Sequence, residues 1–339
     1  MQIALLGDVM LGRLVNDRLT VADPAFPWGD ILPILRQADI RFANLECVLA
    51  DDGTPVPGKV FHFRSDVKNV ECLKSAGIDV VALANNHVLD FGVEALREMF
   101  AALDQHGILR AGAGPDLDAA RRPAVRRVGP HAVGFVAFTD NQPDWEATGR
   151  TPGIHYVPVD DPGDRRATEL LDLVRRTKAR VQLLIVSAHW GANWGSEVPT
   201  EHQSLGRALI EAGADVVFGH SAHIFRGVEI YRNRPVVYSA GDFVDDYAVD
   251  PDERNDQSFI FLLHTMGSVP HMLRLHPTEI TRLHTGRARR SARKIADRMQ
   301  RLSAQLGTPS WWIEDDDVLE IPIGAGPAPG AEEPGSQGP

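Results

Sequence analysis

Side chains that could do chemistry recur in this sequence directly after short apolar runs. Each run reads as a buried strand, and the residues that follow it are carboxylates, carboxamides and imidazoles. The positions are Asp8, Asn44, Glu46, Asn86, His87, His189, His220, His223 and Asp242. Because the strand ends of an α/β sheet meet at one edge, groups placed there converge even when they are far apart in the chain. A metal site requires such a convergence of Asp, Glu, Asn and His.

Taken singly, each of these signals has an ordinary structural explanation. An aspartate after a strand, such as Asp8, is often a turn or helix-cap residue, and a histidine there is often only packed. Those explanations do not account for the repetition at successive strand ends. In the stretch "GHSAH" two imidazoles three residues apart, His220 and His223, could reach one ion or two.

The donor set predicts a divalent transition metal as cofactor. Mixed imidazole and oxygen donors without thiolate suit Mn²⁺, Fe or Zn²⁺ better than a structural zinc. Two ions about 3.5 to 4 Å apart can polarise an electrophile and activate water near neutral pH. Such a centre requires a carboxylate between the ions, nitrogen donors outside, and a non-ligating imidazole near the leaving group. The sequence has candidates for each role, so we predict one or two ions and hydrolytic chemistry.

The elements that position these residues alternate between apolar runs and amphipathic stretches, which is typical of stacked β-α units and predicts an α/β fold. Strands are predicted at 3–7, 39–46, 78–84, 180–191 and 214–220. Helices are predicted at 31–38, 66–77, 93–106, 165–178 and 201–213. The pattern also predicts hairpins at 124–138 and 228–241, separated from each other by a loop at 139–164 and the later strands and helices.

Composition limits the partners and the compartment. The net charge of -11 gives no electrostatic basis for binding nucleic acid; the one basic stretch, 287–298, is either a solvated helix or an anion-binding face. Two distant cysteines, Cys47 and Cys72, favour a reducing compartment. The N-terminus has no cationic segment before its apolar run, and no stretch approaches the roughly 18 apolar residues of a membrane span. We therefore expect a cytoplasmic protein without a membrane anchor.

Several motifs in a fixed order carry a resemblance to a known family. GDVM (7–10), NLE (44–46), ANNH (84–87), HWG (189–191) and GHSAH (219–223) resemble the CapA family, the poly-γ-glutamate capsule synthesis group. KVFHFRS (59–65) and VVYSAGDF (236–243) also fit, and the resemblance spans roughly residues 1 to 265. That family is similar to the calcineurin-like metallophosphoesterases. The resemblance therefore implies a four-layer α/β/β/α sandwich with a dinuclear metal centre.

The resemblance also suggests the limits of the domain and the residues that bind the metal ions. We expect a single domain over 1–322 with a C-terminal helical addition near 286–306, and a disordered tail over 323–339, whose composition cannot pack. Asp8 and His223 would hold the first ion, and Glu46 or Asn44 would lie between the ions. The second ion would be held by Asn86, His189 and His220.

Other residues receive roles around the metal. The resemblance makes His87 the catalytic imidazole, and Asp90 could orient His87 or cap the following helix. Asn85 is expected to fix the turn, and with Asn44 and Arg64 it forms the predicted substrate-binding set. The planar fork of the Arg64 guanidinium suits phosphate or carboxylate; a merely solvated arginine is the alternative.

Two positions depart from the family patterns. Calcineurin-like enzymes begin with Asp-x-His, but here Met10 takes the place of the histidine, so the first site would be weaker, mononuclear, or completed by another group such as Asp242. Where the CapA group has Gly-Asn-Phe, this chain has Gly-Asp-Phe followed by Asp245 and Asp246. The added negative charge could strengthen cation binding or repel an anionic substrate.

The leading functional prediction is a metal-dependent hydrolase that cleaves a phosphoester or a γ-glutamyl-type amide in an anionic substrate, either a small molecule or a γ-glutamyl chain. The alternative is a non-hydrolytic accessory or binding protein that holds poly-γ-glutamate or a small metabolite beside a partner ligase. Met10 and the acidic GDFVDD stretch motivate this alternative. Amide-forming tailoring of a small metabolite would use the same residues, and no oligomeric state is predicted.

Overall fold

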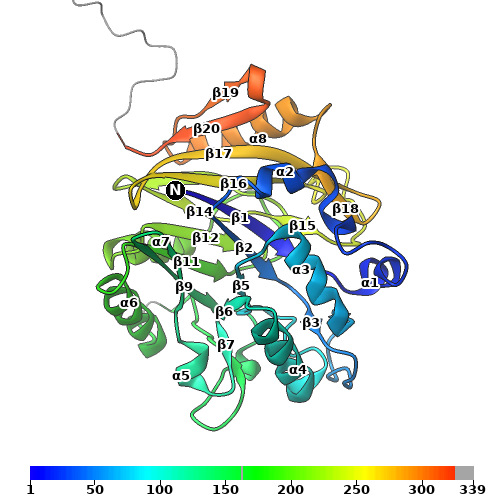
Figure 1. Ribbon diagram of the computed structural model, residues 1–339. Helices are drawn as coiled ribbons and strands as arrows, with labels where there is room; N and C mark the ends of the chain where they lie inside the picture. Colours follow the sequence, from blue (N-terminus) through cyan, green and yellow to red (C-terminus); the bar gives the residue numbers. More distant parts are fainter. Residues whose placement is uncertain (162, 325–339) are drawn as a thin grey trace, which may run out of the picture.

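Two β-sheets packed face to face form the centre of the structure, and helices cover their outer faces (Figure 1). The structure is a computed structural model that describes residues 1–161 and 163–324. The predicted disordered tail, 323–339, therefore lies outside the described residues from 325 onward.

The first sheet mixes parallel and antiparallel strands. Its order is β19-β20-β17-β16-β1-β2-β5-β6, with β15 beside β1 and β18 beside β17. β1, β2, β5 and β6 are parallel to one another, whereas β16 and β17 form a long antiparallel hairpin next to β1. The bounds are β1 Gln2–Val9, β2 Ile40–Leu45, β5 Val80–Ala82, β6 Leu109–Ala111, β15 Asp242–Val244, β16 Gln257–Met266, β17 Val269–Thr281, β18 His284–Arg287, β19 Trp311–Ile313 and β20 Val318–Pro322.

The second sheet has four parallel strands with an antiparallel strand at each edge. Its order is β13-β14-β12-β11-β9-β8. The bounds are β8 Ala124–Val128, β9 His131–Thr139, β11 Leu183–His189, β12 Val216–His220, β13 Val228–Tyr231 and β14 Arg234–Val237. Two short pairs lie outside the sheets: β3 Val48–Leu49 with β4 Arg64–Ser65, and β7 Ala113–Gly114 with β10 Gly153–Ile154.

The helices belong to the connections between strands. They are α1 Arg13–Leu19, α2 Leu32–Leu35, α3 Val70–Ala76, α4 Gly92–Gln105, α5 Leu117–Ala120, α6 Arg165–Lys178, α7 Thr200–Glu211 and α8 Ala292–Gln305, with 3₁₀ turns η1 Phe26–Ile31, η2 Val67–Asn69, η3 Pro143–Trp145 and η4 Glu314–Asp316. Within the described residues, none of the helices combines the length and the apolar character needed to cross a membrane.

Apolar contacts define four layers. Between the sheets, the ring of Phe42 stacks on Phe135 at 5.5 Å between centroids and meets the edge of Phe218 at 6.1 Å. On the outer face of the first sheet, α4 buries Leu96 among strand residues, and α6 buries Leu170 against the second sheet. Burial of such apolar surface is the main favourable term in folding. The expected four-layer α/β/β/α sandwich is therefore confirmed.

Most predicted elements are present, with one large omission. The helices at 93–106 and 165–178 and both hairpins agree with the structure to within a few residues. The long hairpin of β16 and β17 was not predicted, although it supplies the strand that pairs with the whole first half of β1. The helix α8 lies inside the predicted addition, 286–306, and packs Ile295 and Met299 into the core between the sheets. The single-domain boundary at 322 stays a prediction.

Candidate metal centre

The carboxyl ends of the parallel strands place the predicted ligands side by side. In the first sheet Asp8, near the end of β1, is in register with Asn44 on β2 and with Asp242 on β15. In the second sheet His189 ends β11 and pairs with His220, which ends β12. Asp8 and Asp242 come this close because a glycine precedes Asp8: a Cβ at Gly7 would lie 2.0 Å from the carbonyl oxygen of Gly241.

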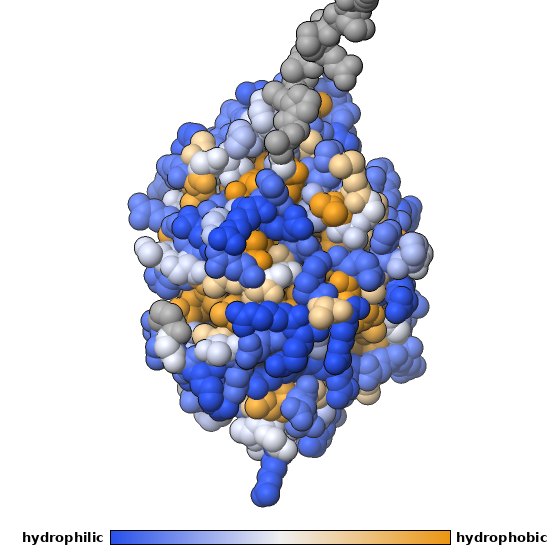
Figure 2. All heavy atoms as spheres, turned by 90° about the vertical axis from the view of Figure 1, so that its left-hand side faces the viewer, coloured by the Kyte–Doolittle hydropathy of each residue, from blue (hydrophilic) through white to orange (hydrophobic). Residues whose placement is uncertain are grey.

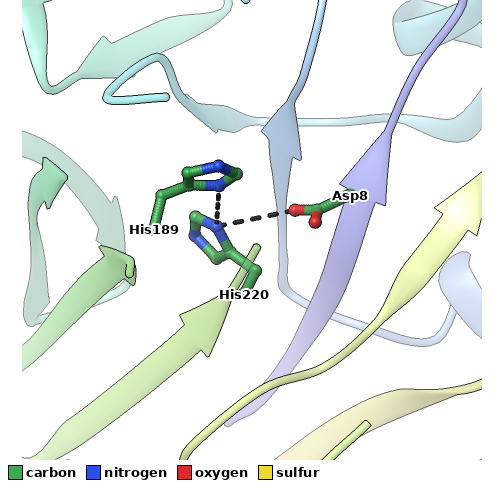
Figure 3. Close-up of side chains that lie close together, drawn as sticks. All are labelled: Asp8, His189 and His220. Carbon is green, nitrogen blue, oxygen red and sulfur yellow. Dashed lines mark hydrogen bonds and ion pairs between the residues drawn. The ribbon is translucent and has the colours of Figure 1, made fainter. Parts of the chain in front are cut away.

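One group of possible ligands joins the two sheets. Asp8, His189 and His220 offer ligand atoms that all lie within 4.8 Å of one another (Figure 3). The Nδ1 atoms of His189 and His220 are 2.9 Å apart, and Nδ1 of His220 is 3.5 Å from Oδ1 of Asp8. On the far side of the His189 ring, Nε2 lies 3.0 Å from Oδ1 of Asn86. The three residues predicted for the second ion are therefore together, and Asp8 is with them.

A second group shares Asp8 with the first. It consists of Asp8, His223 and Asp242, and Nδ1 of His223 lies 2.9 Å from Oδ1 of Asp242. Asp242 therefore stands where the sequence suggested a replacement for the missing histidine. Met10 does not take part in this group, since its sulfur accepts a hydrogen bond from the backbone N–H of Gly12 at 3.0 Å. The carboxylate common to both groups is Asp8, which was expected on the first ion alone.

The carboxylates of the centre are suited to bind a cation, because they are buried and some of their oxygens have no hydrogen-bond partner among the described residues. Asp8, Glu46 and Asp242 are each 1% exposed. In the part of the chain that the structure describes, Oε2 of Glu46 and Oδ2 of Asp242 have no hydrogen-bond partner. Burial and the neighbouring Asp8 carboxylate raise the pKa of Glu46 and of Asp242 well above their ordinary values. Adjacent buried carboxylates of this kind require a positive charge to be stable in the ionised form.

The histidines are suited to act as neutral ligands. Burial lowers the pKa of His220 to about 3 and holds the pKa of His189 well below its ordinary value. Nε2 of His220 is 2.7 Å from the hydroxyl of Ser187, so its Nδ1 faces Asp8. A hydrogen bond on the outer ring nitrogen fixes the orientation of a ligating histidine. Ser187 is a supporting residue that the sequence did not reveal.

Glu46 and Asn44 lie near the shared space in different ways. The Asn44 amide nitrogen donates to Oδ1 of Asp8 at 2.7 Å and lies 3.4 Å from Nδ1 of His189. Oε1 of Glu46 is 3.8 Å from Nε2 of His189 and 3.9 Å from Nε2 of His87. Asn44 is thus adjacent to the carboxylate and the imidazole of the first group, and Glu46 lies between His189 and His87.

His87 is held by Asp90 beside the candidate ligands. Its Nδ1 is 2.6 Å from Oδ2 of Asp90, and its Nε2 is 3.2 Å from the amide nitrogen of Asn86. Burial lowers the pKa of His87 to about 4. Of the two roles open to Asp90, the geometry supports orientation of His87, because α4 begins at Gly92 without a side-chain cap. Lys59 forms an ion pair with the other oxygen of Asp90 at 2.5 Å.

The turn that follows β5 is built by Asn85. Its amide donates to the carbonyl of Leu45 at 2.9 Å and to Oδ1 of Asn44 at 3.1 Å, and its side-chain oxygen accepts the N–H of His87 at 3.0 Å. Asn85 and Asn44 are fully buried. The expected turn-fixing role of Asn85 agrees with these bonds. The substrate-binding role predicted for both residues stays a prediction, since their buried side chains make these internal hydrogen bonds.

A pocket of about 480 Å³ opens beside the centre, and Arg64 is not among the residues that line it. The guanidinium of Arg64 instead lies 4.9 Å from the ring centroid of Phe91. Its predicted anion-binding role therefore has no support from its position. The cations that line the pocket are Arg13 and Lys59, and the imidazoles of His87 and His223 also line it. Arg13 was missed because it follows β1 in a segment without any recognisable signal; Lys59 lies in the KVFHFRS motif from which Arg64 was chosen.

The layered sandwich and the two overlapping ligand groups at its strand ends define the class of protein: a four-layer α/β/β/α sandwich with a candidate divalent-metal site. The chain belongs to the bacterial capsule synthesis protein PGA_cap family, whose model matches residues 2–247. The resemblance to the CapA family drawn from the ordered motifs is thereby confirmed.

Individual relatives cover most of the chain. A probable polyglutamine synthesis accessory protein of Mycobacterium tuberculosis is 35% identical over 330 residues, covering 93% of this chain and 86% of the relative. The PGA biosynthesis protein CapA of Bacillus subtilis is 28% identical over 246 residues, covering 71% of this chain and 62% of the relative. A solved structure of a hypothetical protein from Thermus thermophilus aligns with a TM-score of 0.51 and 16% identity, covering 83% of this chain and 100% of that one. The structural likeness concerns the fold alone.

Proposed function

We propose that this protein is a metal-dependent hydrolase that cleaves a phosphoester or a γ-glutamyl-type amide in an anionic substrate. The observation that carries the proposal is the pair of ligand groups that share Asp8, next to the His87–Asp90 pair. His223, from the second group, and His87 line the pocket beside them. Structural burial alone does not account for this arrangement, because among residues 1–161 and 163–324 it leaves buried carboxylate oxygens without hydrogen-bond partners.

The proposed cofactor is Mn, Fe or Zn, and its proposed ligands are the members of the two groups that share Asp8. Asp8, His189 and His220 would hold one ion, with Asn86 beside His189; Asp8, His223 and Asp242 would hold the other. When bound, such ions supply Lewis-acid activation of the electrophile and of water at neutral pH. Glu46, with one oxygen near His189, is proposed as a further acidic group at the centre.

His87 is proposed to move the proton. The Asp90 carboxylate accepts a hydrogen bond from Nδ1 of His87, which leaves Nε2 to exchange a proton with the leaving group or with water. Stacking of His87 on the ring of Phe63, at 3.9 Å between centroids, keeps the imidazole plane fixed. The Lys59 ammonium neutralises Asp90 from the other side, so the buried carboxylate is compensated on both oxygens.

The anion is proposed to bind at Arg13. This guanidinium lines the pocket that also contains His87 and His223, whereas the net charge of -11 of the whole chain would repel an anion. The positive charge of Arg13 therefore makes the electrostatic potential at the pocket favourable for an anionic substrate.

The test is reconstitution followed by a substrate panel. The purified chain, loaded in turn with Mn²⁺, Fe²⁺ and Zn²⁺, should hydrolyse at least one member of a panel of phosphoesters and γ-glutamyl amides. His189→Ala and His220→Ala should remove both metal and activity. His271→Ala, an exposed histidine on β17, is the matched control and should change neither. Absence of bound transition metal in the wild-type chain, with no effect of the two substitutions, would overturn the proposal.

A non-hydrolytic accessory role is the second candidate, and the name of the mycobacterial relative favours it, since that protein is described as a probable synthesis accessory protein. In that role the same centre would hold a γ-glutamyl chain or an anionic metabolite beside a partner ligase. Metal binding without turnover on the whole panel, together with saturable binding of a γ-glutamyl peptide, is the result that selects it. A cytoplasmic location is part of either proposal.

A further inference from the structure

The pocket beside the candidate metal centre has two chemically different sides. Its volume is about 480 Å³, and residues from several separate segments of the chain line it. Arg13, Phe61, Phe63, Trp194 and Tyr247 are among them. Since His87 and His223 line the same pocket, any group bound in it lies next to the residues proposed for catalysis.

The polar side offers hydrogen-bond donors. The Nε atom of Arg13 pairs with Asp246 at 3.2 Å, which fixes the guanidinium and leaves its two outer nitrogens for another partner. The hydroxyl of Tyr247 is buried and, among the residues that the structure describes, has no hydrogen-bond partner. The Tyr247 ring lies edge-on to His223, with centroids 5.1 Å apart. A buried hydroxyl without a partner costs free energy that a bound ligand oxygen would recover.

The apolar side consists of exposed aromatic rings. Phe61 is 58% exposed and Trp194 is 47% exposed, although large aromatic side chains gain most from burial. Both rings lie close to polar groups: the Arg13 guanidinium is 5.8 Å from the Phe61 centroid, and the Trp194 centroid is 5.8 Å from that of the His223 imidazole. The exposed rings therefore adjoin the polar side of the same pocket.

In the face of the molecule that Figure 2 shows, hydrophilic and hydrophobic residues are interspersed.

The position of Trp194 at the pocket is set by a buried cation. The Arg226 guanidinium is 2% exposed, and it donates to the carbonyl of Gly195 at 2.8 Å and to that of Trp194 at 3.3 Å. A buried arginine bonded to two loop carbonyls holds this segment in one place, so the indole is presented at the pocket before any ligand arrives. Such preorganisation lowers the entropic cost of binding.

We propose that this pocket is a substrate subsite for an anion that carries a planar apolar group. Arg13 and Tyr247 donate to the anionic oxygens, and Phe61 and Trp194 pack against the planar group. The inference rests on the proposed hydrolase function, because it names the class of substrate that this centre would take. A planar group fits the aromatic rings through stacking and edge contacts, which an aliphatic chain of the same size does not make.

Binding of two phosphonates tests the inference, because neither contains a bond that the proposed hydrolase would cleave. Phenylphosphonate and methylphosphonate carry the same anion and differ only in the planar group. Titration calorimetry on the metal-loaded full chain should give a Kd for phenylphosphonate about tenfold lower than for methylphosphonate. Trp194→Ala and Phe61→Ala should each reduce this ratio, and Tyr247→Phe should weaken both ligands by a similar factor.

The matched control is Trp312→Ala, which removes an indole on β19 that does not line the pocket. It should leave both affinities unchanged. Equal affinities for the two phosphonates, no binding of either, or loss of the phenyl preference in Trp312→Ala as well would overturn the subsite. If the protein prefers phenylphosphonate but hydrolyses no member of the substrate panel, the hydrolase proposal fails and the subsite stands. If it hydrolyses a substrate but binds the two phosphonates equally, the subsite fails and the hydrolase proposal stands.

Discussion

The most direct prediction concerns the separate roles of Asn86 in metal binding and of His87 in proton transfer. The two residues are neighbours at the end of β5, but Asn86 Oδ1 lies 3.0 Å from His189 Nε2, whereas His87 is bonded to Asp90. Asn86→Ala should therefore lower metal occupancy, and His87→Ala should leave the metal in place and lower the rate.

The magnitudes follow from the contacts that each substitution removes. Loss of a neutral oxygen donor or of a partner that orients a ligating histidine lowers metal affinity by about 10- to 100-fold, or about 1.4 to 2.7 kcal/mol. Loss of a general acid or base lowers the rate by about 10² to 10⁴. His87→Ala removes no contact to His220 or Asp8, so its metal content should equal that of the wild type.

The assay separates these effects by measuring metal and rate on the same samples. Each variant is dialysed against a series of buffered free Zn²⁺ or Mn²⁺ concentrations, and bound metal is counted by inductively coupled plasma mass spectrometry. The rate is then measured at saturating metal. Asn193→Ala, which removes another pocket carboxamide, is the control and should keep full occupancy. Metal loss in His87→Ala with normal occupancy in Asn86→Ala would refute the assignment.

Three further perturbations test other parts of the structure. Asp8→Asn should abolish binding of both ions, whereas Asp242→Asn should reduce the metal stoichiometry from two to one; equal losses in native mass spectrometry would contradict the shared role of Asp8. Burial raises the pKa of Asp140 to about 6, so the folded state holds this proton more tightly than the unfolded chain and the stability contributed by protonation is lost as pH rises from about 4 through 6. Asp140→Asn should consequently raise the free energy of unfolding by about 1 to 3 kcal/mol at pH 8 and hardly at all at pH 4 in urea titrations; the same gain at both pH values would exclude this explanation. Phe42→Ala, which removes the ring between Phe135 and Phe218, should cost about 3 to 5 kcal/mol, and a loss below about 1 kcal/mol would mean that the sheets do not depend on this contact.

The sequence was most informative where a residue follows a strand. Asp8, His189 and His220 could be placed together because parallel strands bring their carboxyl ends to one edge, whatever the length of chain between them. Asp242 was predicted from the apolar run that precedes it, residues 236–241; in the structure it begins the three-residue strand β15, which pairs in parallel with β1.

Residues away from the strand ends of the two sheets could not be found in this way. Arg64 was chosen for its chemistry, yet Arg13, at the start of α1, and Lys59 line the pocket, because the paths of these connecting segments depend on tertiary contacts that have no period in sequence. Tyr247 was missed for the same reason. The hairpin of β16 and β17 was overlooked although its apolar run is visible, since nothing in the run says which strand it will join.

The two sheets contribute to the centre from opposite sides of the sandwich core. Asp8 and Asp242 belong to the first sheet, and His189 and His220 belong to the second. Elsewhere the contact between the sheets is apolar and non-directional. Such a contact opposes separation of the two sheets, because separation exposes apolar surface, more than it opposes sliding of one sheet along the other. An ion with ligands on both sheets would add a directional link at their shared edge and fix the alignment of one layer on the other. With an ion bound, the centre would thus also link the two halves of the fold and would fix the positions of the residues that line the pocket.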